Sequence, residues 1–112
     1  MTVTIYHNPA CSKSRATLAL IRAAGIEPHI VEYLAEPLGA DVIQTLLAES
    51  GLPARAAMRS DAPEFAQIQS DWSEAQLIAW LAQHPRLLNR PFVRSSKGTR
   101  LCRPPERVLE IL

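Results

Sequence analysis

The chain has 112 residues, of which 47% are hydrophobic and 21% are charged, with a formal net charge of +1, two cysteines and nine prolines. Its length predicts one domain spanning residues 1–112, and its near-neutral charge argues against a nucleic-acid partner. It has two cysteines, no signal-peptide pattern and no apolar run near the roughly 18 residues that cross a membrane. We therefore expect a cytoplasmic protein without a membrane partner.

The first quarter predicts a strand followed by a helix. Residues 2–6 are β-branched or aromatic throughout, which is typical of a strand that ends near His7. Polar and apolar side chains do not alternate there, as expected when both faces of a strand are covered. A helical pattern begins at Ser12 and closes at Gly25, with Thr17 among the side chains expected to face solvent.

Residues 28–34 form a second strand signal, so the first third of the chain predicts a βαβ unit with parallel strands. The middle is helical. An apolar stripe over residues 42–47 ends at a glycine, and a short helix is expected after Pro53. Residues 61–71 are polar and expected to be irregular, and a capping box opens a further helix at residues 73–76.

The last quarter predicts two short strands and a helix. Residues 91–93 and 99–102 are β-like runs about a hairpin turn, and Pro104-Pro105 opens a final helix. The apolar residues expected on that helix are Val108, Leu109, Ile111 and Leu112. This order of elements predicts an α/β sandwich of about four strands, with a helical insertion at about residues 38–85.

Cys11 has the position that most favours chemistry. It lies between the first strand and the first helix, where unpaired amide N–H groups and the helix dipole favour an anion. With Lys13, Arg15 and His7 nearby, its pKa is expected to fall from about 8.5 into the range of roughly 3.5–7.5, which makes a nucleophilic thiolate. The alternatives are an inert buried cysteine and a loop histidine that bonds its own backbone.

Other cysteine chemistries fit the spacing less well. Ser14 stands where a C-x-x-C dithiol has its second cysteine, so Cys11 is a monothiol that must resolve with an outside thiol. A tyrosine-phosphatase loop needs an arginine at the position of Thr17. The histidines show no paired ligand spacing, so no metal site is expected. Cys102 is expected to be a buried structural thiol, without a disulfide to Cys11.

An exposed thiolate without a general base suits an electrophile that carries its own charge, such as a tetrahedral oxyanion held by arginines. The candidate arginines are Arg59, Arg90 and Arg103; the last two each precede a proline, and a cis Arg90-Pro91 peptide is compatible with that position. Residues 86–107 hold seven basic residues and one acid. These are either solvated faces or cations that converge on an anion.

Three separated motifs together resemble the glutaredoxin-coupled arsenate reductases and their short, poorly characterised relatives. They are residues 5–11 (IYHNPAC) with Ser14-Arg15, residues 89–91 (NRP) and residues 98–104 (GTRLCRP). The resemblance covers essentially the whole chain. It implies a thioredoxin-like fold, with a four-stranded mixed sheet flanked by helices and a helical insertion, in agreement with the order of elements.

Carried over residue by residue, the resemblance implies that Cys11 attacks arsenate to form a covalent thiol–arsenate intermediate, and that His7 tunes this cysteine. The oxyanion-binding arginines would be Arg59, Arg90 and Arg103, supported by Ser14 and Arg15. No bound cofactor is implied. Glutathione would be the co-substrate, glutaredoxin the partner that resolves the mixed disulfide, and arsenite the product. We expect the protein to act as a monomer.

Two departures from the family pattern bear on the substrate. Ser12-Lys13 replaces the Gly-Thr of the well-characterised resistance enzymes, and longer members continue beyond the position of Leu112. Two alternative functions therefore stay open. One is a non-enzymatic thiol-stress regulator on the same fold, which a C-x-x-C switch would favour. The other is a glutathione-dependent thiol transferase that does not act on arsenate.

Overall fold

The computed structural model describes residues 2–112 and contains a four-stranded sheet in the order β2-β1-β3-β4. The strands are β1 (Thr4–His7), β2 (His29–Glu32), β3 (Phe92–Ser95) and β4 (Gly98–Leu101). β1 pairs with β2 in parallel and with β3 antiparallel, and β3 and β4 form an antiparallel hairpin. The predicted mixed four-stranded sheet is therefore confirmed.

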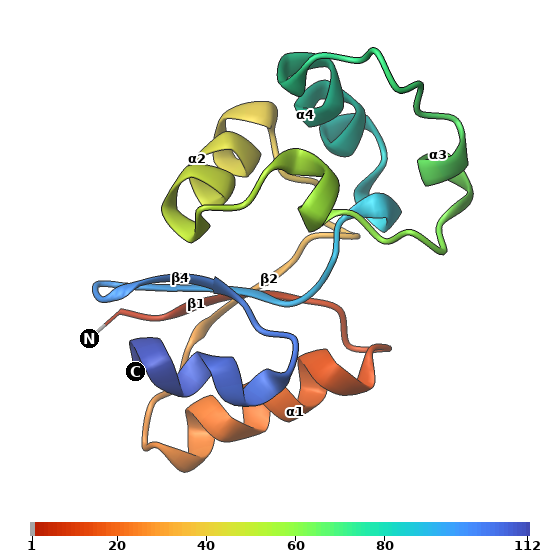
Figure 1. Ribbon diagram of the computed structural model, residues 1–112. Helices are drawn as coiled ribbons and strands as arrows, with labels where there is room; N and C mark the ends of the chain where they lie inside the picture. The colour runs from red at the N-terminus through yellow and green to blue at the C-terminus, as the bar shows by residue number, and fades with distance from the viewer. Residues whose placement is uncertain (1) are drawn as a thin grey trace.

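Helices cover both faces of this sheet (Figure 1). The α-helices are α1 (Ser12–Ala23), α2 (Ala40–Ser50), α3 (Pro63–Ala66) and α4 (Glu74–Gln83), and the 3₁₀ helices are η1 (Ala54–Ala57), η2 (Pro85–Leu87) and η3 (Pro105–Ile111). α1 and the C-terminal η3 lie side by side on one face, and α2 and α4 lie over the other. None of the helices in residues 2–112 is long and apolar enough to cross a membrane.

Each face of the sheet has its own apolar core. Under α1 and η3, the side chains of Ile5, Val93 and Cys102 are fully buried with Ile21 and Val108. On the opposite face, a larger cluster joins the sheet to α2 and α4 and is centred on residues such as Leu46, Leu81 and Phe92. Because every residue of β1 after Thr4 is buried, the prediction that both of its faces are covered is confirmed.

Some local expectations differ from the structure. Thr17 is fully buried because its Oγ1 donates to the Lys13 carbonyl oxygen at 2.8 Å, which satisfies the hydroxyl inside the helix. The last helix is 3₁₀: at three residues per turn, Val108 and Ile111 share the buried line while Leu109 is 55% exposed. The polar stretch at 61–71 contains one helical turn, α3.

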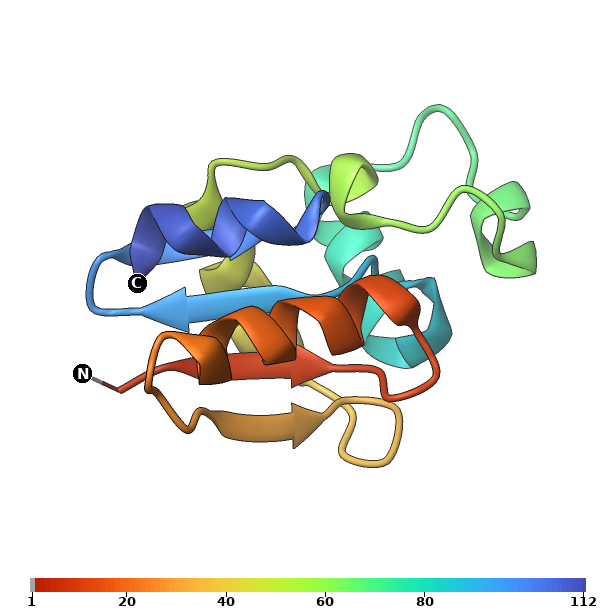
Figure 2. The same ribbon diagram turned by 90° about the horizontal axis from the view of Figure 1, so that it is seen from below.

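The segments that the sequence analysis identified as candidates lie at one end of the sheet (Figure 2). β1 runs towards this end and leads into the start of α1, while β3 begins there and β4 ends there. The start of β1 and the C-terminus lie at the opposite end. The fold thus brings the loop before α1 next to the loops that precede β3 and follow β4.

Candidate functional site

Cys11 is the N-cap residue of α1, with an extended backbone conformation (φ −94°, ψ 123°). Its N–H donates to the Asn8 carbonyl oxygen, and its own carbonyl oxygen accepts from the Arg15 N–H, both at 3.0 Å. The residue is 8% exposed. The sulfur therefore lies over the first turn of the helix, where amide N–H groups have no partner within the helix.

The pKa of the Cys11 thiol is lowered. Burial acts in the opposite direction, but it is outweighed by the nearby Ser14 backbone N–H, by the charge of Arg90, by the Lys13 N–H and by the Arg103 side chain. All of these contributions favour the charged form of the sulfur. The helix start and two arginines from remote loops thus favour the thiolate form of Cys11.

His7 contacts Ser14 in the first turn of α1. Its Nδ1 lies 2.6 Å from Ser14 Oγ, which also accepts a hydrogen bond from the Asn8 N–H at 3.1 Å. Both His7 and Ser14 are buried, and burial lowers the pKa of His7, so the ring is neutral at neutral pH. This bridge fixes the start of α1, whose Ser14 N–H contributes to the lowered pKa of Cys11.

Two backbone links carry the three candidate arginines to this end of the sheet. An isolated antiparallel bridge pairs Met58 with Leu88, and the Arg59 N–H donates to the Leu87 carbonyl oxygen at 2.7 Å, so Arg59 lies against the segment that leads to Arg90. The second link is a hydrogen bond from the Cys102 N–H to the Pro91 carbonyl oxygen, 2.9 Å long. The peptide bonds Arg90-Pro91 and Arg103-Pro104 are both cis.

Arg90 and Arg103 both lower the pKa of Cys11, and they are also joined to each other. Arg103 Nη1 donates to the Arg90 carbonyl oxygen at 3.0 Å. The Nε of Arg90 is buried and has no hydrogen-bond partner among residues 2–112, while its Nη1 makes a 3.4 Å contact with Asn89 Oδ1. A buried guanidinium N–H without an acceptor, next to a thiolate, suits a ligand oxygen.

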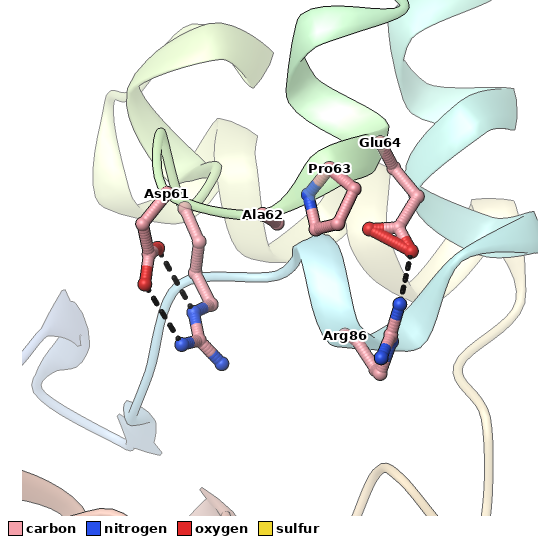
Figure 3. A pocket seen from close by; sticks show the side chains of 6 residues that line it. Asp61, Ala62, Pro63, Glu64 and Arg86 are labelled. Atoms are coloured by element: carbon pink, nitrogen blue, oxygen red, sulfur yellow. Dashed lines mark hydrogen bonds and ion pairs between the residues drawn. The ribbon is translucent and has the colours of Figure 1, made fainter.

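Arg59 points to a carboxylate of its own segment. Its Nε and Nη2 donate to the two carboxylate oxygens of Asp61 at 3.3 and 3.1 Å. Figure 3 shows this bidentate pair at one side of a cavity of about 120 Å³, with the Glu64–Arg86 ion pair at the other. Arg59 thus lies at the same end of the sheet as Cys11, but its guanidinium group is paired with the Asp61 carboxylate.

Most basic side chains of residues 86–107 lie next to a carboxylate. Arg86, Arg94 and Arg100 form ion pairs with Glu64, Glu49 and Glu110. Arg107 lies 3.9 Å from Glu110. Both interpretations of this basic segment therefore hold in part: these four cations belong to solvated faces, whereas Arg90 and Arg103 converge on the thiol.

Arg15 and Cys102 lie apart from the sulfur of Cys11. Arg15 is exposed, and its Nη1 donates to the Pro9 carbonyl oxygen at 2.8 Å, which ties the loop to the helix rather than contacting the thiol. Cys102 is fully buried in the apolar core, and both cysteines are free. Burial raises the pKa of Cys102 to about 12, which is expected of an inert structural thiol.

Three residues around the site were not singled out in the sequence: Asn8, Tyr33 and Asp61. Asn8 Oδ1 accepts from the Ala10 N–H at 3.0 Å. Burial raises the pKa of Tyr33, although the charge of Arg90 and the Asn8 side chain oppose this effect. The Asn8-Pro9 pair signals a turn, which could have indicated Asn8. Tyr33 and Asp61 carry no comparable local signal.

The arrangement suits a tetrahedral oxyanion placed against a nucleophilic sulfur. It provides a thiolate, helix N–H groups and planar guanidinium groups that form charge-assisted hydrogen bonds. Within residues 2–112, no group of three His, Cys, Asp or Glu side chains is arranged to hold a metal ion.

Comparisons with known proteins point to one family. The ArsC family model matches residues 6–111. The chain is 50% identical over 115 residues to an arsenate reductase of Rhizobium meliloti (strain 1021), covering all of this chain and 82% of the relative. It is 46% identical over 113 residues to an arsenate reductase of Escherichia coli, covering 98% and 80%. An arsenate reductase structure from Vibrio cholerae superposes with a TM-score of 0.95 at 42% identity, covering 100% of this chain and 98% of the other.

Proposed function

The chain belongs to the ArsC family, and we propose that it is an arsenate reductase whose nucleophile is the Cys11 thiolate. The resemblance drawn from three sequence motifs is confirmed by the match over residues 6–111. The thioredoxin-like α/β fold is confirmed by the superposition on the Vibrio cholerae structure. The individual roles below are argued from the geometry of this chain.

Arsenate binds, in this proposal, between the start of α1 and the guanidinium groups of Arg90, Arg103 and Arg59. The unpartnered Nε of Arg90 supplies one donor towards the anion. The Arg103 side chain, which already favours the thiolate form of Cys11, would bridge the sulfur and an arsenate oxygen. Because these donors are held by backbone links and are partly buried, they need little rearrangement when negative charge arrives.

The reaction then proceeds through two sulfur–arsenic bonds. The Cys11 sulfur attacks arsenic and an arsenate oxygen leaves as water, which gives a thiol–arsenate adduct. The glutathione thiol displaces a second oxygen as water in the same way. Both sulfur–arsenic bonds then break as the two sulfurs bond to each other, which leaves an electron pair on arsenic and reduces As(V) to As(III). One water adds back to the arsenic, which leaves as arsenite. Glutaredoxin takes the glutathione from the Cys11–glutathione disulfide and restores the thiol.

The observation that carries this proposal is the convergence of two linked arginines, Arg90 with its unpartnered Nε and Arg103, on a thiol at the N-cap of α1. A monothiol with no partner cysteine requires an outside thiol, and Cys102 lies in the apolar core. Glutathione and glutaredoxin meet that requirement. The same reasoning supports a reducing, cytoplasmic setting. We retain the expectation of a monomer without a bound cofactor.

The supporting roles in the proposal are indirect. His7 and Ser14 position the helix start through their 2.6 Å contact, and the Ser14 N–H helps to lower the pKa of Cys11. Arg15 holds the Cys11 loop through the Pro9 carbonyl oxygen. These residues act through Cys11 and the loop, whereas Cys11 itself meets the substrate.

A coupled assay tests the proposal. Arsenate, glutathione and glutaredoxin are supplied with wild type or Cys11→Ser, and arsenite formation is followed while each component is omitted in turn. We expect arsenite only when all components and Cys11 are present. If a glutathionylated peptide is turned over but arsenate is not, the protein is a thiol transferase. Turnover of neither substrate leaves the non-enzymatic regulator.

A further inference from the structure

Among the arginines of the proposed oxyanion site, Arg59 is the one paired with a carboxylate in the described structure. Its Nε and Nη2 donate to both oxygens of Asp61, so one full edge of the guanidinium is occupied (Figure 3). Arg90 and Arg103 instead bond an amide oxygen and a backbone carbonyl oxygen, which are neutral acceptors. A carboxylate presents the same paired oxygens to an arginine as an arsenate or phosphate does.

The carboxylate of Asp61 is close enough to Arg59 and Arg90 for their charges to act on it. Its hydrogen bonds from Arg59, together with the charges of Arg59 and Arg90, lower the pKa of the Asp61 carboxyl. The carboxylate is therefore ionised at neutral pH and close enough for Arg90 to act on it. An arriving oxyanion and Asp61 are two negative groups drawn to the same cations.

In the Arg59–Asp61 ion pair, Asp61 is the more exposed partner and can therefore move away more easily. Its side chain is 72% exposed, whereas the Arg59 side chain is 25% exposed. Exposed ion pairs are weak because water solvates both partners and a held side chain loses rotamer freedom. A doubly charged oxyanion among several guanidinium groups has the stronger attraction, and repulsion between the two anions favours movement of Asp61 into solvent.

We propose that Asp61 is an internal competitor for Arg59, which the substrate oxyanion displaces when it binds. This inference rests on the proposed function, because it takes Arg59 to be an oxyanion ligand. Asp61 thereby sets the affinity and specificity of the site: weakly charged anions do not release Arg59, whereas a more highly charged oxyanion does. Asp61 itself makes no contact with the reacting atoms.

The test compares Asp61→Asn with Asp71→Asn. Asn keeps the size of the side chain at position 61 but removes its charge. Asp71 is an exposed acid of the same chain segment, so its variant makes the same change in net charge without touching Arg59. Arsenate affinity is measured by calorimetry for wild type, the two single variants, Arg59→Ala and the double variant Arg59→Ala/Asp61→Asn.

We expect Asp61→Asn to bind arsenate roughly two- to fivefold more tightly than wild type, the range typical of an exposed ion pair. Asp71→Asn should be unchanged. The gain must also vanish in the Arg59→Ala background, because it arises from releasing that guanidinium. A second readout is the pH profile of Cys11 alkylation, which should move to lower pH in Asp61→Asn as Arg59 is freed to act on the thiolate.

The remaining outcomes contradict the inference in distinguishable ways. If Arg59→Ala weakens arsenate binding but Asp61→Asn leaves it unchanged or weakens it, Asp61 orients Arg59 or is inert, and the proposed function stands. A gain that persists without Arg59, or that Asp71→Asn reproduces, is a general charge effect and overturns the competition. If Arg59→Ala does not alter arsenate binding, both this inference and the role proposed for Arg59 are wrong.

Discussion

Arg103 donates a hydrogen bond from Nη1 to the backbone carbonyl oxygen of Arg90, 3.0 Å away, and its side chain helps to lower the pKa of the Cys11 thiol. One guanidinium therefore joins the loop after β4 to the loop before β3 and acts on the thiol at the start of α1. Its planar fork allows both interactions to be made together, which a lysine ammonium on a flexible stem does not reproduce.

Replacing Arg103 should consequently affect the thiol and the substrate together. We expect Arg103→Ala to raise the pKa of Cys11 and to weaken arsenate binding by roughly 10- to 100-fold, the usual range for a lost hydrogen bond to a charged group. Arg103→Lys should recover only part of both effects. Calorimetry and the pH profile of alkylation measure them. An unchanged thiol profile in Arg103→Ala would show that the contact with the sulfur is unimportant.

The two cysteines should differ sharply in reactivity. Helix N–H groups and arginines lower the pKa of Cys11, whereas burial raises that of Cys102 to about 12. At neutral pH we expect iodoacetamide to modify Cys11 in the folded protein and to leave Cys102 intact until denaturant is added. Peptide mapping identifies the site. Cys102→Ser should keep the fast reaction, and its loss in that variant would contradict the assignment.

The Ser14 hydroxyl should matter more for folding than for the charge of the thiolate. In Ser14→Ala, the buried Asn8 N–H and the His7 ring lose their shared partner, which we expect to lower the free energy of unfolding by about 1–3 kcal/mol. The backbone N–H that bonds Cys11 remains, so the alkylation profile should move little. Ser12→Ala, at an exposed position of the same turn, is the control for denaturant titrations.

Because His7 is buried, we expect the free energy of unfolding to depend on pH. Burial lowers its pKa below the ordinary value of 6.5, so the unfolded chain binds a proton more readily than the folded one. This contribution to stability is fully present above about pH 6.5 and is lost as the pH falls through the folded pKa. Wild type should therefore lose stability across this window relative to His7→Gln. Parallel curves for the two proteins would show that His7 is not the titrating group.

Local patterns in the sequence were sufficient to predict the sheet and the position of Cys11. The strand before His7 and the helix from Ser12 follow from β-branched and helical periodicity, and together they place the cysteine at a helix start. Thr17 was placed wrongly because its hydroxyl is satisfied inside its own helix. The 3₁₀ form of η3 likewise reflects packing on α1, which periodicity does not contain.

Partners across the site could be predicted only in part. The sequence indicates three candidate arginines. Only tertiary contacts distinguish Arg90 and Arg103, which lower the pKa of Cys11, from Arg59, which is paired with Asp61. Which member of a basic segment is neutralised depends on acids far away in the sequence, as with Glu49 and Arg94. Such pairings depend on the folded geometry rather than on local spacing.

The most direct test of Cys11 as the arsenate-reducing nucleophile is a single turnover without oxygen and without glutaredoxin. Wild type is mixed with arsenate and glutathione, and the products are analysed by intact-protein mass spectrometry and arsenite determination. We expect one glutathione bound to Cys11 for each arsenite formed, neither product without arsenate, and neither in Cys11→Ser. Arsenite formed equally well by Cys11→Ser, or no arsenite and no adduct from wild type, would contradict the proposed role of this thiol.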